Sequence, residues 1–252
     1  MRLFKGKVGK SDFDEDNFKY KETAHTKQYI DVLSAFIGRA RLRQQAFYDL
    51  TIKGRDWEVD FNNGVLSFGD SQHDIQFIGT ESYVTNTWLW GVDNVNNFKE
   101  EIVKDAYLFF SSSMMGNLEE LKSNELVLDE YINGHNLASI ISAAHYEKVC
   151  YFKCPMPSSE TSAFVLVRMV PDEVFAPAGS GSVSKLIVEL LSQLPLNHKI
   201  LVKNILIDNC SRVEGNSTSL TGYFRDNTAL TTIFDYRGHL ESMELSFTAA
   251  AQ

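Results

Sequence analysis

The chain has 252 residues, of which 44% are hydrophobic and 23% are charged, and its formal net charge at pH 7 is −9. A chain of this length and composition buries a substantial core, which excludes disorder throughout. The negative charge disfavours binding to nucleic acid, because neutralising phosphates requires clustered Lys and Arg. The composition therefore predicts a folded protein whose acidic surface suits solubility or a basic protein partner.

The sequence predicts neither a membrane span nor a secretory signal. Apolar runs stay short of the roughly 18 residues that a membrane helix needs, and charged sequence follows Met1 at once. The three cysteines, Cys150, Cys154 and Cys210, are too few and too irregularly spaced for a disulfide framework. We therefore expect a cytoplasmic protein with reduced thiols.

The first fifty residues divide into two parts. Residues 1–25 alternate Lys, Asp, Glu and Phe without apolar periodicity and are expected to form an arm. Residues 26–50 carry apolar side chains at helical spacing, which predicts an amphipathic helix that packs one face on a sheet. Arg39, Arg41 and Arg43 are spread around this helix, about 200° apart, so we interpret them as solvated.

A β meander is predicted next, with strands over residues 56–61, 65–68, 75–78 and 83–90. The Asn-Gly pair at 63–64 between alternating residues is the strongest hairpin signal in the chain. Trp88 and Trp90 are two residues apart, so their indoles should share one face of the last strand. We expect Trp57 to join them beneath the helix of residues 26–50.

The following segments predict, in order, a helix over 95–107 that continues to residue 115, a short helical turn over 118–121, a strand or a helix over 127–131, a helix over 136–145, and strands over 146–153 and 163–169. Helices that flank a meander and a hairpin are typical of an α+β fold. We therefore predict an α+β domain over residues 26–170, in which helices pack on an antiparallel sheet.

A second, smaller α+β lobe is predicted over residues 171–252, because Pro, Gly and Ser cluster at 171–184. It should contain one helix, capped by Ser184 and stopped at Pro195, and about four antiparallel strands over 200–207, 219–224, 229–236 and 240–247. Residues 179–182 are interpreted as a linker, because their glycines do not follow a clear strand.

The sequence contains no recognisable metal or cofactor motif. Its six histidines show no HExxH pair, and no Walker loop or dinucleotide-binding glycine pattern occurs. The nearest approach to a zinc site is His145 with Cys150 and Cys154, and a fourth ligand is missing nearby. We predict no metal, no cofactor and no assigned catalytic residue.

One ordered set of segments suggests a family. Trp57-Glu58-Val59-Asp60 is followed by Gly64 to Phe68 and then by Trp88-Leu89-Trp90-Gly91-Val92-Asp93-Asn94. This order resembles a bacterial family of uncharacterised cytoplasmic proteins that share a WLWAWAN-like segment, and the resemblance covers about residues 26–168. The family implies no particular activity. Val92 stands where the family carries a third aromatic residue.

Two functions from different classes stay open. The first is a non-enzymatic protein-binding module, such as a cytoplasmic immunity or antitoxin protein that covers a basic bacterial toxin. The second is a small-ligand-binding or hydrolytic domain whose pocket lies near the end of the tryptophan strand, with His145 close by. The candidate binding residues for either function are Trp88, Trp90, Asp93, Asn94 and Glu81.

Overall fold

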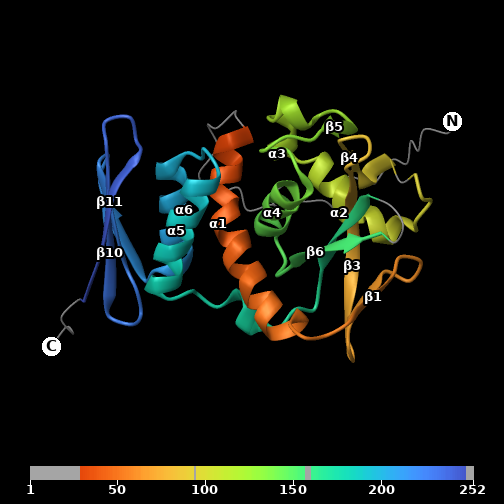
Figure 1. Ribbon diagram of the computed structural model, residues 1–252, viewed down its shortest axis with the longest axis horizontal. Helices are drawn as coiled ribbons and strands as arrows, with labels where there is room; N and C mark the ends of the chain where they lie inside the picture. Colours follow the sequence, from red (N-terminus) through yellow and green to blue (C-terminus); the bar gives the residue numbers. More distant parts are fainter. Residues whose placement is uncertain (1–28, 94, 157–159, 248–252) are drawn as a thin grey trace.

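The computed structural model describes residues 29–93, 95–156 and 160–247. The predicted arm, residues 1–25, and the candidate Asn94 lie outside these ranges. The fold is α+β, as predicted: two antiparallel sheets lie at opposite ends of the molecule, and helices fill the space between them (Figure 1). None of the helices in these ranges is long and apolar enough to cross a membrane.

The larger sheet has seven antiparallel strands around β3, the longest of them. One side of β3 pairs with β2 and β4, which continue to β1 and β5, and the other side pairs with β7 and then β6. The strands are β1 (Trp57–Asp60), β2 (Val65–Phe68), β3 (Ser71–Ser82), β4 (Thr87–Trp90), β5 (Glu125–Val127), β6 (Cys150–Pro155) and β7 (Thr161–Val167). Residues 83–86, predicted as strand, form the turn between β3 and β4.

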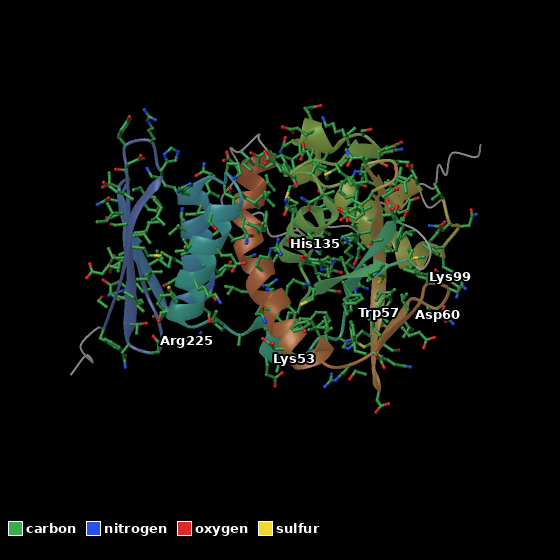
Figure 2. All side chains as sticks on the ribbon, viewed as in Figure 1. Lys53, Trp57, Asp60, Lys99, His135 and Arg225 are labelled. Atoms are coloured by element: carbon green, nitrogen blue, oxygen red, sulfur yellow. The ribbon has the colours of Figure 1, made fainter. Side chains whose placement is uncertain are left out.

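The β1–β2 hairpin forms where the Asn-Gly pair predicts it. Gly64 has a φ of 68°, a conformation that glycine adopts without strain, and the Asp60 carboxylate accepts the backbone N–H groups of Asn62 and Asn63. The prediction for Trp57 was wrong. Its side chain (Figure 2) is 38% exposed and contacts Phe152 of β6 edge-on at 5.4 Å, so it does not join the buried indoles of Trp88 and Trp90.

The helices of this part are α2 (Glu100–Phe110), α3 (Ser113–Gly116) and α4 (Gly134–Ala144), with single 3₁₀ turns η3 (Gly91–Asp93) and η4 (Glu119–Leu121). α4 begins after Asn133, whose side chain accepts the backbone N–H of Asn136 and so satisfies one unpaired donor of the first turn. α2 begins five residues later than predicted. Of the segment left open between strand and helix, residues 127–131, only Val127 lies in the short strand β5, and residues 128–131 form a loop.

The first described helix, α1 (Tyr29–Phe47), ends in a π-helical turn, η2 (Tyr48–Ile52). The prediction that one face packs on a sheet holds only for the last turns of α1, where Gln44 exchanges two hydrogen bonds with the Tyr151 backbone of β6. The rest of α1 lies between α4 on one side and α6 on the other (Figure 1). A Cβ added at Gly38 would lie 2.3 Å from the Ile205 side chain of α6, so glycine permits this close approach. Two small residues, Ala35 and Gly38, therefore create a second contact face that apolar periodicity does not reveal.

The carboxy-terminal part contains η5 (Asp172–Phe175), α5 (Ser180–Gln193), α6 (His198–Asn209) and a four-stranded antiparallel sheet in the order β11-β10-β9-β8. Its strands are β8 (Arg212–Gly215), β9 (Ser219–Tyr223), β10 (Thr228–Phe234) and β11 (Leu240–Phe247). α5 begins at Ser180 rather than after Ser184, so residues 180–182, interpreted as linker, are helical. There are two helices instead of the one predicted.

The predicted strand over residues 200–207 was wrong, because this segment belongs to α6. The Asn197 side chain accepts the Ile200 N–H and caps the helix. Leu201, Val202, Ile205 and Leu206 are buried, at spacings that one face of a helix brings together. Packing of this face on α1 therefore overrides the strand preference of an isoleucine-rich segment.

The apolar core is continuous from α4 through α1 to α5, α6 and β10. A second cluster lies under the β1–β2 hairpin and includes Phe47, Phe68, Phe77 and Val165. α1 thus joins the seven-stranded and four-stranded sheets through one body of buried side chains.

Candidate functional site

The indoles of Trp88 and Trp90 share one face of β4, as predicted, and both are buried, at 0% and 2% exposure. Their ring centroids lie 5.5 Å apart in an edge-to-face arrangement. Gly79 lies opposite Trp90 on β3, and a Cβ there would lie 2.3 Å from the Trp88 ring. The motif forms a closed aromatic layer in the core, and neither indole reaches solvent.

Glu81 lies on the same side of the sheet, paired with Trp88 across β3 and β4. Its buried carboxylate accepts hydrogen bonds from the Gly134 N–H at 3.0 Å, from Lys153 Nζ at 3.0 Å and from the Tyr83 hydroxyl at 2.9 Å. Burial raises the pKa of Glu81, but these three hydrogen bonds outweigh burial and hold that pKa below its usual value. Glu81 therefore stays ionised and fixes the first turn of α4 to the sheet.

The remaining candidates do not join this group. Asp93 is exposed, and its carboxylate accepts a hydrogen bond from Asn124 Nδ2 at 2.9 Å. Asn94 lies outside the described residues. Beside Glu81, burial lowers the pKa of His135 to about 4, with nearby Lys153 and Arg41 adding to the effect, so this histidine at the start of α4 is neutral at pH 7 (Figure 2).

A second buried charged cluster was not predicted from the sequence. The Asp105 carboxylate of α2 receives Arg168 Nη2, at 3.0 and 2.9 Å, and faces His145 Nε2 at 3.2 Å. The Glu147 N–H donates to His145 Nδ1, which places the ring proton of a neutral His145 on Nε2, toward Asp105. Both ring nitrogens thus lie 3.1–3.2 Å from polar groups inside the protein, an arrangement that orients loops rather than a substrate.

The cysteine thiols are not activated. Burial raises the pKa of Cys150 and of Cys154 to about 12. Within residues 29–93, 95–156 and 160–247, no three His, Cys, Asp or Glu side chains form a group that could hold a metal ion.

The surface formed by the described residues includes two hollows large enough to hold a small molecule. One, of about 840 Å³, lies along β1 and β3 near Phe61 and Phe98. The other, of about 480 Å³, lies between α1, η5, α6 and the loop after α4, where Arg39, Arg43 and Lys148 meet. Neither hollow is lined by Trp90 or Asp93.

The arginines at the second hollow correct a prediction. Arg39, Arg41 and Arg43 are all half-buried rather than solvated. Helices cover α1 on both sides, so side chains spread around its axis meet protein in nearly every direction.

The outer edge of β11 is the longest strand edge in the part of the chain that the structure describes. Five strands form sheet edges in the described ranges, and β11, with eight residues, is the longest. The next longest, β6, carries Lys153 and ends at Pro155, two residue types that discourage pairing with another chain. β11 contains neither lysine nor proline.

Exposed apolar side chains accompany this edge. Leu245 and Phe247 are 48% and 90% exposed, and Tyr236 in the preceding hairpin is 86% exposed. Leu245 pairs with the buried Leu230 of β10, so it lies on the face of the sheet that α5 and α6 cover only in part. Glu244, one residue along, lies on the opposite face.

Comparison with protein families matches residues 30–170 to the family described as "Family of unknown function (DUF6882)". No curated protein and no solved structure matches the chain. The matched range runs from α1 to just beyond β7 and contains the tryptophan motif, whereas α5, α6 and the four-stranded sheet lie after it. Because the match covers more than half of the sequence, the chain belongs to this family of unknown function.

Proposed function

We propose that this protein is a non-enzymatic protein-binding module that captures an extended segment of a basic partner along the edge of β11. The open edge carries the proposal. A strand without a neighbour exposes a row of backbone N–H and C=O groups, and adding a strand to such a row is a common mode of peptide recognition.

The side chains around the edge define the chemistry of the partner. Leu245 and Phe247 offer apolar contacts on one face of the strand, while Glu244 projects from the other and Glu241 lies at its start. The complementary segment is amphipathic, with apolar residues on one face and Lys or Arg on the other. The net charge of −9 would accelerate the encounter with a basic protein.

In its concrete form, the proposal is a bacterial cytoplasmic immunity or antitoxin protein whose partner is a basic toxin. The charged clusters built around Glu81 and Asp105 support binding rather than catalysis, because their members pair with one another inside the protein. The second function, a ligand pocket or hydrolytic site at Trp90 and Asp93, receives less support: one of these side chains is buried in the core, the other is exposed, and neither lines a described hollow.

The test is capture of partners from the native host with the intact chain as bait, beside two charge-reversal variants. Glu241→Lys/Glu244→Lys reverses the charge along β11. Glu120→Lys/Glu125→Lys makes the same change at two exposed positions near β5 and serves as the matched control.

We expect one basic protein at near-equal stoichiometry with the wild type and with the control. For the purified pair, the β11 variant should lower the association rate about tenfold at low salt. Leu245→Lys/Phe247→Lys should weaken the complex further by removing the apolar contacts. An empty capture, or equal association rates for all variants, would contradict the proposal.

A further inference from the structure

The hollow between α1 and α6 contains one arginine, Arg39, that is fully hydrogen-bonded and one, Arg43, that is not. Arg39 uses its whole guanidinium: Nε donates to Asp208 at 2.7 Å, Nη2 also donates to Asp208, and Nη1 donates to the Ala143 carbonyl at 3.1 Å. This bidentate pair closes one side of the hollow and neutralises both charges.

Arg43, one helical turn further along α1, has no such partner. Its guanidinium lies over the Phe175 ring, 5.1 Å from the centroid, and it forms no hydrogen bond or ion pair with another residue in the described ranges. Burial lowers the pKa of Arg43, and repulsion from Arg39 lowers it further. The guanidinium stays charged because its pKa is so high, and Asp208, the carboxylate that attracts it, is already paired with Arg39.

The surroundings of Arg43 suit a small organic anion. The hollow measures about 480 Å³, within the range of small-molecule sites. Leu42 and Val174 give it apolar walls, while Lys148 adds a second cation at its exposed rim, already paired with Asp172. The two carboxylates that line the hollow, Asp208 and Glu147, are paired with Arg39 and Arg168. A half-buried cation without a hydrogen-bonded carboxylate is costly to a fold, and an anion that binds there lowers that cost.

We propose that this hollow is a binding site for a small organic oxyanion, a carboxylate or a phosphate ester, which the Arg43 guanidinium grips through two parallel N–H donors. The apolar body of the ligand lies against Leu42 and Val174. The Phe175 ring lies beneath the guanidinium and restricts its movement, which favours a bidentate contact with a planar or tetrahedral oxyanion.

The experiment measures the thermal midpoint of the full chain with increasing inorganic phosphate or benzoate, against sodium chloride at equal ionic strength. The variants are Arg43→Gln and, as the matched loss of one arginine, Arg237→Gln in the exposed β10–β11 hairpin. At probe concentrations well above the dissociation constant, we expect the midpoint of the wild type and of the Arg237 variant to rise by about 3 °C or more. The Arg43 variant should show no rise.

The two probes separate the sources of the anion. A response to phosphate alone assigns phosphate esters, and a response to benzoate alone assigns carboxylates. Response to neither probe, or an equal response in the Arg43→Gln variant, would overturn the proposal. Because the Glu241→Lys/Glu244→Lys variant leaves this hollow intact, it should respond as the wild type does, so the two proposals can fail separately.

The stability of the ligand-free variants supplies a second criterion. A binding arginine predicts that Arg43→Gln without ligand unfolds at the same temperature as the wild type or higher, whereas a structural arginine predicts a lower one. If Arg43→Gln does not fold, Arg43→Lys replaces it. Lysine lacks the planar fork, so probe binding should weaken about tenfold, and undiminished binding would also overturn the proposal.

Discussion

At the scale of single residues, two buried carboxylates in the family-matched part, Glu81 and Asp105, connect separate elements of the fold. Glu81 joins β3 to the first turn of α4, and Asp105 joins α2 to the residues that follow α4 and β7. Both carboxylates satisfy backbone or arginine donors far away in the sequence. Their hydrogen bonds fix the relative positions of elements that apolar packing alone would leave free to shift.

Glu81→Gln should lower the free energy of unfolding at pH 7 by about 2 kcal/mol, because Lys153 loses its charged partner in a buried site. The folded pKa of Glu81 lies below its ordinary value of 4.5, so its contribution is complete above that pH and is lost as the pH falls through the folded pKa. Urea unfolding of both proteins at several pH values measures this. The difference should shrink under acid conditions, and a difference that grows there would contradict the prediction.

Two kinds of residue show how far the sequence predicts the site. Alternation within β4 predicts the shared face of Trp88 and Trp90, because strand geometry is local. The environment of Arg43 cannot be obtained in this way, since it depends on η5 and α6, which come more than 120 residues later. Helical spacing alone leaves each arginine of α1 on an apparently free surface.

At the scale of elements, α1 connects the two parts of the molecule, because it packs on both α4 and α6. Its contact with α4 follows from apolar spacing, whereas its contact with α6 depends on small residues that admit a second helix. Elements defined by local turn chemistry, such as the β1–β2 hairpin, were predicted correctly. The strand predicted over 200–207 failed because its apolar residues satisfy both helical and extended patterns, and tertiary packing selects the helix.

Gly38→Ala tests the close approach of α1 and α6. The added methyl overlaps Ile205, so we expect a loss of about 1–3 kcal/mol in unfolding free energy despite the better helix propensity of alanine. Gly181→Ala in α5 is the matched control, because its Cβ would meet no atom within 4 Å, and it should be neutral or stabilising. In a double-mutant cycle, Ile205→Ala should absorb much of the Gly38→Ala effect; strict additivity would mean that the contact does not form.

At the scale of the whole molecule, the continuous core predicts that both sheets unfold together. All three tryptophans lie between residues 57 and 90, so their fluorescence reports only the part that contains the seven-stranded sheet, while far-ultraviolet circular dichroism reports every helix and strand. We expect the two thermal midpoints to coincide, with equal calorimetric and van't Hoff enthalpies. Two separate transitions would show that α5, α6 and their sheet fold independently of α1.

The hollow beside α1 combines residues from inside the family-matched range with residues that follow it. Arg39 and Arg43 belong to the matched residues, but Phe175 and Asp208 come from the segment beyond them. Ligand preference at the proposed site therefore depends on residues from both parts of the chain. A different segment after residue 170 would present other side chains to Arg39 and Arg43 and so reshape the hollow. Exchange of that segment would thus change specificity while the tryptophan layer stays untouched.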